Sequence, residues 1–370
     1  MLSAATLLAL AAGCQTVPSP GAPRARRAPS PAPRPSQTPR PQPALPPRPP
    51  PSAPPQPAPA PPAAVPRPLP PPARLPSSSE LPPETGALTF RETLALQTFL
   101  DRQNFSPGCL DGRLGARTRE AWRAWREAHG RPAGAEPDRD ALGALGRPED
   151  AFTVHLVTAE EHAELSFVPE SWLERSRLAY LGYRTILEGV AEKYHASEAA
   201  IRRLNPAVAW PDPPPGTALV VPNPQPYRKA QAAKLTIELG KKQLSAYDAQ
   251  ERRIALFPCS IAADVEKRPL GELRVVNAAS DPDYTFDPSL FTEDPEARRL
   301  QRKLRIPPGP NNPVGLAWLS LDRPGYGIHG TPKPEDIGKT ESHGCFRLAN
   351  WNARKLLQMV RLGTPVIVQP

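Results

Sequence analysis

The chain has 370 residues, 56 of them proline, and a formal net charge of +9 at pH 7. This length is too great for one ordinary domain, and so much proline excludes a chain that is globular throughout. Eight arginines against two glutamates give residues 15–86 a charge of +6, which leaves +3 for the rest of the chain. The basic balance therefore does not indicate a nucleic-acid surface, because the excess lies in a proline-rich arm without aromatic platforms. We expect this arm to adhere to anionic envelope polymers or lipid head groups.

The first fourteen residues, MLSAATLLALAAGC, form a short apolar run that ends in Cys14. The run is too short to span a bilayer as a stable helix. It resembles a secretory signal that ends in a bacterial lipoprotein processing site, which implies that Cys14 becomes the lipidated N-terminus. An ordinary secretory signal that is cleaved elsewhere is the alternative.

Residues 15–86 are dominated by proline, as in PQPALPPRPPPSAPPQPAPA. Such a segment lacks the apolar, β-branched and aromatic residues that would offset the entropy of folding, so we expect it to be disordered. Its polyproline II character predicts a semi-rigid spacer that reaches about 200 Å when fully extended. Because a tether is useful when its far end is fixed, the spacer favours the lipid anchor.

Residues 87–147 predict two helices around the glycine-rich loop SPGCLDGRLG. The segment resembles the small helical peptidoglycan-binding domain. The resemblance rests on eight positions: Leu96, Gln97, Asp111, Gly112, Gly115, Thr118, Ala121 and Trp125. We expect Trp122 and Trp125 to lie in the core rather than to form a sugar platform, because they share one helical face.

Residues 152–224 predict a compact unit with helices at 186–194 and 197–204 and a strand at 218–221. The unit resembles a degenerate LysM module, most clearly in IRRLNP and PGTALVVP. The resemblance implies either binding of glycans that contain N-acetylglucosamine or a purely structural spacer.

Residues 234–369 are numerous enough to bury a core of their own. KLTIEL alternates apolar with polar residues, and similar short runs follow: RRIALFPCSIA, ELRVVNAA, VGLAWLSL, GYGIHG and TPVIVQ. These patterns predict a chiefly β segment. One helix is expected near the end, with Asn350 as N-cap, Gly363 as its C-terminal stop, and three inward-facing side chains, Leu356, Leu357 and Val360.

The fold class that follows is multidomain. A small all-α domain and an α+β module precede a mainly β, sandwich-like domain with a C-terminal helix, and all three come after the long proline-rich linker.

The cysteines narrow the search for a reactive group. If Cys14 is lipidated, Cys109, Cys259 and Cys345 remain, which is an odd number in a compartment that favours disulfides. At least one thiol therefore stays free. Cys109 and Cys259 lie in different predicted domains among apolar neighbours, and we expect both to be buried, inert thiols. A bridge between them would require the two domains to pack together.

Cys345 stands in KTESHGCFRLANW, and His329 stands a short way upstream in GYGIHGTP. A nucleophilic cysteine needs a base, and it needs unobstructed backbone N–H groups to receive an oxyanion. Gly344 allows a tight turn in which its own amide and that of Cys345 point at one carbonyl oxygen, while Ser342 can anchor the loop.

Three interpretations of this cluster remain. In the first, the histidines belong to loops or to the core, and the thiol is buried. In the second, His329, His343 and Cys345 bind zinc, although HGC gives only an i, i+2 pair and no fourth ligand is evident. In the third, the cluster is a cysteine acyl-transfer site.

GYGIHGTP followed by SHGCFRL resembles the signature of the bacterial L,D-transpeptidases of the YkuD type, the ErfK-like family. The likeness extends through VEKRPLGELRVV, PPGPNNPVGLAWLSL and NWNARKLLQMV. It implies that Cys345 is the nucleophile, His329 the general base and the Gly330 carbonyl the group that orients the imidazole. It also implies that His343 and Gly344 form the oxyanion loop together with Cys345.

The same resemblance implies that Tyr326, Ser342 and Arg347 contact the substrate. Arg347 would hold a substrate carboxylate, and a structural ion pair is the alternative for it.

The activity implied by the resemblance is acyl transfer from the third residue of a peptidoglycan tetrapeptide stem, with release of D-alanine. The product is a 3→3 cross-link, or an attached envelope lipoprotein. A carboxypeptidase that uses water, and an inactive peptidoglycan-binding lipoprotein, are the alternatives. No metal or organic cofactor is expected. The expected partners are stem peptides, glycan and, through the lipid anchor, the membrane, in the periplasm of a bacterial envelope.

Overall fold

The computed structural model describes residues 88–370 except 133, 135, 139–141, 144, 145, 292 and 340–343. Cys14, the signal and the linker up to residue 86 therefore lie outside the described residues, as do Ser342 and His343. Every described residue belongs to one unit of the chain, Arg67–Pro370. Within the described part, no helix has the length and apolar character needed to cross a membrane.

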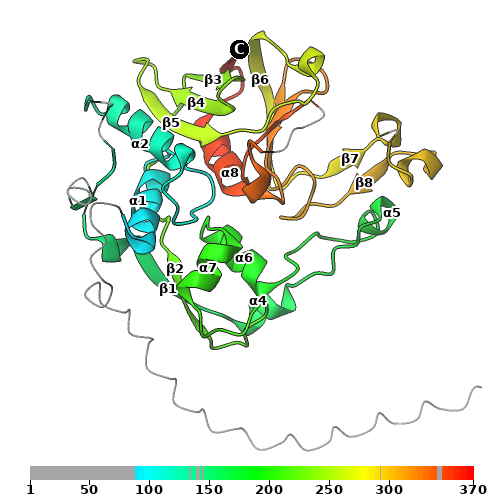
Figure 1. The fold of residues 1–370 in the computed structure, drawn as a ribbon. Coiled ribbons are helices and arrows are strands. Elements are labelled where there is room, and N and C mark those ends of the chain that lie inside the picture. Colours follow the sequence, from blue (N-terminus) through cyan, green and yellow to red (C-terminus); the bar gives the residue numbers. More distant parts are fainter. Residues whose placement is uncertain are drawn as a thin grey trace, which may run out of the picture. The chain divides into compact units, whose positions relative to one another are not determined.

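The first described helices are α1 (Phe90–Arg102) and α2 (Ala116–Ala128), which match the two helices expected from the sequence (Figure 1). Trp122 and Trp125 are 2% and 5% exposed and stack on each other in the core, as predicted. Both rings are thus withheld from any ligand surface.

The Gln97 side chain fixes the conformation of the glycine-rich loop between these helices. Its side-chain oxygen accepts hydrogen bonds from the backbone N–H groups of Asp111 (2.9 Å) and Gly112 (2.8 Å), and its amide donates to the Thr118 hydroxyl (3.0 Å). Gly112 has φ +68°, and a Cβ there would lie 2.2 Å from the Phe90 ring. These motif residues hold the loop against the helices.

The next segment contains a short 3₁₀ turn, four helices and two strands. They are η2 (Pro148–Ala151), β1 (Phe152–Leu156), α4 (Ala159–Ala163), α5 (Trp172–Arg175), α6 (Ile186–Lys193), α7 (Glu198–Leu204) and β2 (Ala218–Pro222). Strands β1 and β2 pair antiparallel. The sequence predicted α6, α7 and β2 but not β1, α4 or α5. The Asn205 side chain ties α7 to β2, because it accepts from the Val220 N–H (2.7 Å) and donates to the Val220 carbonyl (2.8 Å).

The third segment is mainly β, as predicted. Its strands are β3 (Lys234–Glu238), β4 (Gln243–Tyr247), β5 (Arg253–Pro258), β6 (Gly271–Ser280), β7 (Tyr284–Phe286), β8 (Leu304–Ile306), β9 (Ala317–Leu321), β10 (Gly327–His329), β11 (Phe346–Arg347) and β12 (Pro365–Gln369). Short 3₁₀ turns lie at η3 (Val265–Lys267), η4 (Pro288–Leu290), η5 (Ala297–Arg299) and η6 (Pro334–Asp336).

Eight of these strands form one sheet in the order β11-β10-β9-β6-β12-β3-β4-β5, and β7 and β8 form a separate hairpin. Residues 271–274 of β6 pair with β12, and residues 275–280 pair with β9 across a bulge near Val275. A bulge bends a strand and increases its twist, so β6 can redirect the sheet where two halves meet. The expected sandwich-like domain thus takes the form of one continuous sheet.

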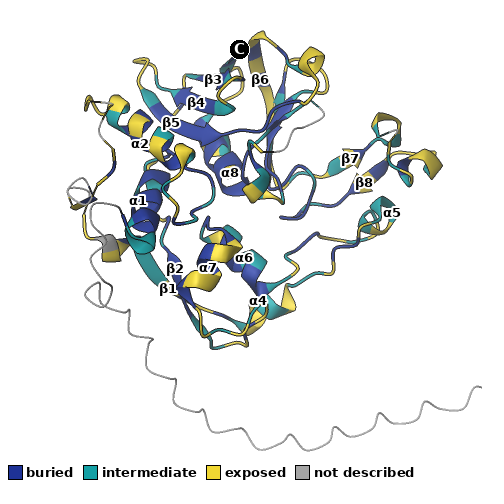
Figure 2. Ribbon diagram, viewed as in Figure 1, coloured by how far each residue is buried: buried dark blue, intermediate teal, exposed yellow. Residues whose placement is uncertain are grey.

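Helix α8 (Asn350–Met359) packs against β6, β9 and β10. The N-cap prediction was wrong by one residue: Ala349 occupies that position, and the Asn350 side chain is engaged in tertiary hydrogen bonds instead. Leu356 is buried, whereas Leu357 is only partly buried. The helix ends before Gly363, because Val360 is already extended. Most of α8 is buried (Figure 2).

A buried charge cluster joins the three described segments. The Asp101 carboxylate on α1 accepts from Lys355 Nζ on α8 (2.8 Å) and from His195 Nδ1 after α6 (2.8 Å). All three side chains are less than 8% exposed. The His195 ring also stacks on Trp351 of α8, with centroids 5.1 Å apart. The helical segment and the module of residues 148–224, which we call the accessory module, are therefore both in direct contact with the β segment.

Cys109 and Cys259, the other two cysteines that the structure describes, are free thiols. Cys259 is fully buried, and burial raises its pKa to about 12, as expected of an inert thiol. Cys109 is only partly buried, contrary to expectation, yet burial of its sulfur still raises its pKa.

Candidate active site

His329 and Cys345 both lie at one edge of the eight-stranded sheet, His329 at the end of β10 and Cys345 just before β11. Strands β10 and β11 are parallel, with Ile328 opposite Phe346 and His329 opposite Arg347. Ile328 and Phe346 are buried in the core. Side chains alternate along a strand, so His329, Arg347 and the preceding Cys345 share the other face.

The His329 imidazole is held in one tautomer. Its Nδ1 donates to the Gly330 carbonyl at 2.6 Å, and because a carbonyl can only accept, Nε2 carries the lone pair. The Trp318 ring stacks on the imidazole with centroids 5.4 Å apart. Burial lowers the pKa of His329 to about 4, the Gly330 bond opposes this shift and Arg347 adds to it. The ring is therefore neutral at pH 7.

Cys345 is half-buried, and its Sγ lies 3.5 Å from the Gly325 carbonyl. Burial raises the pKa of the thiol, while the Gly327 N–H and the Arg347 charge oppose that shift. The resting sulfur is therefore a protonated thiol rather than a thiolate.

Tyr326 and Gly344 lie beside the thiol. A Cβ on Gly344 would be 3.9 Å from the Tyr326 ring, over which the Arg323 guanidinium lies at 4.8 Å from the centroid. Ser342 and His343 lie outside the described residues, so the loop before Gly344 is not placed.

The backbone of Arg347 is fixed by two hydrogen bonds with the backbone of Ser260. Its N–H donates to the Ser260 carbonyl at 3.0 Å and its carbonyl accepts from the Ser260 N–H at 2.9 Å. Burial lowers the pKa of the half-buried guanidinium, and the nearby Cys259, Asp336 and Cys345 oppose that shift. The side chain thus contributes positive charge close to Cys345.

Asn350 is a site component that the sequence analysis assigned only to a helix cap. It is fully buried, and its Oδ1 accepts from the Leu316 N–H at 3.1 Å. A Cβ on Gly330 would lie 2.2 Å from that oxygen, and a Cβ on Gly315 would lie 1.9 Å from it. Glycines at positions 330 and 315 indicate that another group approaches the backbone closely, but nothing in the sequence identifies Asn350 as that group.

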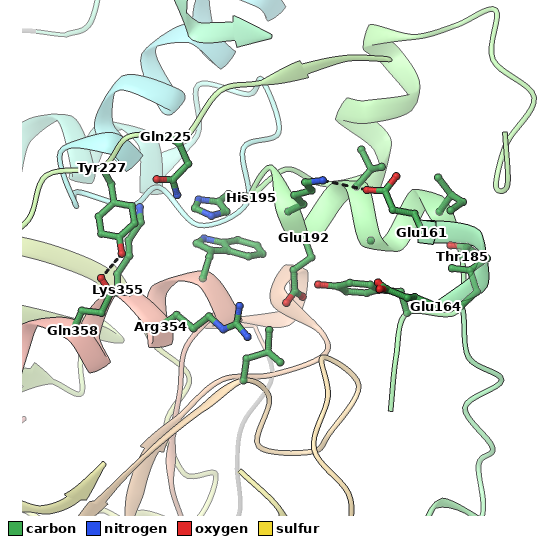
Figure 3. Close-up of a pocket in the computed structure, with 18 residues that line it drawn as sticks. Glu161, Glu164, Thr185, Glu192, His195, Gln225, Tyr227, Arg354, Lys355 and Gln358 are labelled. Carbon is green, nitrogen blue, oxygen red and sulfur yellow. Dashed lines mark hydrogen bonds and ion pairs between the residues drawn. The ribbon is translucent and has the colours of Figure 1, made fainter. Parts of the chain in front are cut away.

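A cavity of about 480 Å³ lies near this region, between the accessory module and α8 (Figure 3). Neither Cys345 nor His329 lines it. Glu192 of α6 and Trp351, Arg354 and Lys355 of α8 belong to its wall. The cavity is therefore distinct from the site around the thiol.

A metal centre finds no support in the described part of the chain, where no group of three or more His, Cys, Asp or Glu is placed to hold an ion. His343 is outside that part, so the zinc hypothesis stays untested.

Comparison with known proteins finds a family match over the β segment. The family model for the L,D-transpeptidase catalytic domain, YkuD, matches residues 232–368. A Bacillus licheniformis protein named L,D-transpeptidase YkuD is 28% identical over 189 residues, which are 50% of this chain and 93% of that protein. A Fuscovulum blasticum protein, named as an L,D-transpeptidase in the ATP synthase subunits region, is 30% identical over 134 residues, which are 36% of this chain and 68% of that protein.

Among solved structures, the L,D-transpeptidase of Xylanimonas cellulosilytica is 16% identical, with a TM-score of 0.33, and the match covers 78% of this chain and 100% of that chain. The family of this chain is shown by the family model and the Fuscovulum relative, without that structural match. With its mainly β segment at residues 234–369, the chain belongs to the L,D-transpeptidase family.

Proposed function

We propose that Cys345 is the nucleophile and His329 the general base of an acyl transfer on peptidoglycan stem peptides. The observation that carries the proposal is the hydrogen bond from His329 Nδ1 to the Gly330 carbonyl, at 2.6 Å, which leaves Nε2 free to accept a proton. Membership of the L,D-transpeptidase family supplies the substrate class.

In the first half of the reaction, the Cys345 sulfur attacks the carbonyl carbon of the third stem residue. Because thiol and imidazole are both neutral at rest, the thiol proton passes to His329 Nε2 as the S–C bond forms. The C–N bond to D-alanine then breaks, and the imidazolium returns the proton to the leaving amine. A thioester on Cys345 remains.

In the second half, an acceptor amine attacks the thioester carbonyl and gives a proton to His329. The C–S bond breaks, and the sulfur recovers that proton from the imidazolium. A side-chain amine on a neighbouring stem gives a 3→3 cross-link, and an amine of an envelope lipoprotein gives a protein anchor. Water gives hydrolysis.

The negative charge on the attacked carbonyl oxygen requires donors that are already in place. We assign this role to the amides of Gly344 and Cys345, with His343 in the same loop. We assign substrate contacts to Tyr326, Arg347 and Ser342. Arg347 is suited to a substrate carboxylate, because burial of its guanidinium strengthens pairing with an anion.

The remaining parts of the chain fit delivery of the thiol to the cell wall. Four parts of the chain would keep the catalytic domain, residues 234–369, near periplasmic peptidoglycan. They are a lipid on Cys14, a spacer over residues 15–86, a peptidoglycan-binding-like domain at residues 87–147 and a LysM-like module at residues 152–224. Such tethering raises the local substrate concentration without new contacts at the active site.

Mass spectrometry tests the proposal directly. The whole chain is incubated with a disaccharide tetrapeptide, and both the muropeptides and the intact protein are followed, with Cys345→Ala as the control. We expect loss of D-alanine, a cross-linked dimer, and an acyl adduct on the protein that is absent from the variant.

The other outcomes separate the alternatives. Loss of D-alanine without a dimer would indicate hydrolysis and favour a carboxypeptidase. Unchanged turnover by Cys345→Ala would overturn the assignment of the nucleophile. Binding to sacculi without turnover by either protein would favour a peptidoglycan-binding lipoprotein.

A further inference from the structure

A hydrogen bond links the accessory module to the start of α8, where Asn350 packs against the Gly330 backbone next to His329. Asn350 Nδ2, at the start of α8, donates to Glu192 Oε1 of α6 at 2.9 Å. Figure 3 shows Glu192 on the wall of the cavity that Arg354 and Lys355 of α8 also line. Glu192 is the side chain through which the accessory module contacts Asn350.

The Asn350 amide has little freedom to turn. Its two N–H groups point at Glu192 and at the Pro310 carbonyl (3.3 Å), and its oxygen accepts from the Leu316 N–H (3.1 Å). The residue is fully buried, so water cannot replace a lost partner at low cost. Loss of the Glu192 acceptor would leave a buried donor unsatisfied and allow the amide to reorient.

Reorientation of Asn350 would disturb the backbone next to the catalytic base. The amide oxygen is packed against two glycines. A Cβ added to Gly330 would lie 2.2 Å from this oxygen, and a Cβ added to Gly315 would lie 1.9 Å from it. The Gly330 carbonyl is the acceptor that fixes the His329 ring. A small shift of Gly330 is therefore transmitted to the position of Nε2.

We propose that Glu192 is a positioning residue for the reaction: it holds Asn350, which fixes the Gly330 carbonyl and, through it, the His329 imidazole. The consequence is that the accessory module completes the active site rather than merely delivering it. This inference rests on the role of His329 in the proposed function, but its test includes a measurement without substrate.

The environment of Glu192 determines which substitutions will keep the hydrogen-bond acceptor for Asn350 and which will remove it. Burial raises its pKa to about 8, the Asn350 bond and the Arg354 charge oppose the shift, and Glu188 adds to it. At pH 7 the group is mostly a neutral acid that supplies an oxygen acceptor. Glutamine has the same shape and also supplies an oxygen, whereas leucine supplies none.

The experiment compares Glu192→Gln, Glu192→Leu and Glu161→Leu in the whole chain. Glu161 lines the same cavity, but its partners, His155, Thr158 and Lys193, all belong to its own module. We expect Glu192→Leu to lower kcat by about 10- to 100-fold with KM changed by less than about threefold, as is typical of a misplaced base. Glu192→Gln and Glu161→Leu should both stay within about threefold of wild type in kcat.

The pH profile distinguishes a displaced base from an unstable module. The Gly330 bond raises the pKa of His329, so weakening it in Glu192→Leu should move the acidic limb of kcat/KM to lower pH. Thermal unfolding of each variant provides the measure of stability. A kcat loss in Glu161→Leu equal to that in Glu192→Leu, or no rescue by Glu192→Gln, would overturn the inference.

Alkylation of Cys345 by iodoacetamide supplies the measurement without substrate. Its rate against pH reports how Nε2 assists loss of the thiol proton, whatever the true acyl donor is. We expect a changed rate and profile in Glu192→Leu, and an unchanged rate in Glu192→Gln. If the wild type fails to turn over muropeptides but these rates differ as expected, the proposed function fails while the link survives. Identical alkylation in all variants would overturn the link itself.

Discussion

The protonation state of His329 is set by burial together with three neighbours of that one side chain. The Trp318 ring covers one face, the Gly330 carbonyl accepts a hydrogen bond from Nδ1–H, and Arg347 adds positive charge nearby. Burial and the Arg347 charge both disfavour the imidazolium, and the carbonyl only partly compensates. The base is therefore ready to accept a proton at a pH where an ordinary histidine would be mostly charged.

The activity should consequently persist in acid. With the pKa of His329 lowered to about 4, the base form is intact at pH 5.5, and kcat/KM should fall to half its plateau near pH 4 rather than near the ordinary histidine value of about 6.5. Trp318→Leu admits water to the ring, so its acidic limb should move to higher pH. Ser320→Ala removes only the partner of the Trp318 indole N–H and should leave the limb in place. A wild-type midpoint near pH 6.5 would contradict the buried, neutral base.

At the scale of elements, the β7–β8 hairpin depends on the accessory module. Trp172 is the first residue of α5, and its ring stacks on Phe286 with centroids 4.2 Å apart, while its Nε1 donates to Asp294 at 2.9 Å. Glu296 accepts from the Ser171 hydroxyl and from the backbone N–H groups of Trp172 and Leu173. Tyr284 of this hairpin interacts electrostatically with Cys345, and its pKa is raised to about 12, mainly by burial. The accessory module thus supports a hairpin that lies near enough to Cys345 for its charge to affect Tyr284.

Trp172→Ala should loosen this hairpin selectively. Loss of a partly buried ring costs about 1–3 kcal/mol of local stability, less than truncation of a fully buried tryptophan. Hydrogen exchange of the backbone amides of β7 and β8 should accelerate, while exchange in β3, β4 and β12 stays unchanged. Phe167→Ala lies in the same stretch but removes a ring that is 84% exposed, so it serves as the matched control. Equal exchange in both variants would show that the hairpin is stable by itself.

The elements that sequence periodicity predicted are those whose pattern is local. Leu235 and Ile237 alternate with polar residues in KLTIEL and are buried in β3. By contrast, α5 is four residues long and exists because Trp172 packs on a hairpin more than a hundred residues away. No window of sequence contains both partners, so such elements escape a periodicity analysis.

The same distinction applies to the site. Cys345, His329 and Gly330 stand in short motifs, and the structure brings them to one sheet edge. The bond between Glu192 and Asn350 joins residues 158 positions apart. The sequence predicted Asn350 as a helix cap because asparagine is common at N-cap positions. In the structure its side chain instead forms hydrogen bonds with Glu192, Pro310 and Leu316.

At the scale of the whole described unit, the Asp101 cluster determines whether its segments act together. Burial alone would raise the pKa of Asp101, but Lys355 and His195 overcome this and hold it below its usual range. The stability contributed by the carboxylate is therefore present above its unfolded pKa of about 3.9 and is lost as the pH falls below it. Each of the three segments supplies one member, so separation of any segment would expose or strand a charge.

Lys355→Met tests this coupling, because it strands the Asp101 carboxylate in a site where both side chains are at most 2% exposed. Removal of one partner of a buried pair costs about 3–5 kcal/mol, whereas neutralising both partners costs much less. Chemical unfolding should therefore show a large loss for Lys355→Met and partial recovery in the Lys355→Met, Asp101→Asn double variant. Lys234→Met breaks an exposed pair with Glu251 and should cost at most about 1 kcal/mol. If the double variant lost as much as the sum of its single variants, the two groups would be independent and the segments would be held together by apolar contacts alone.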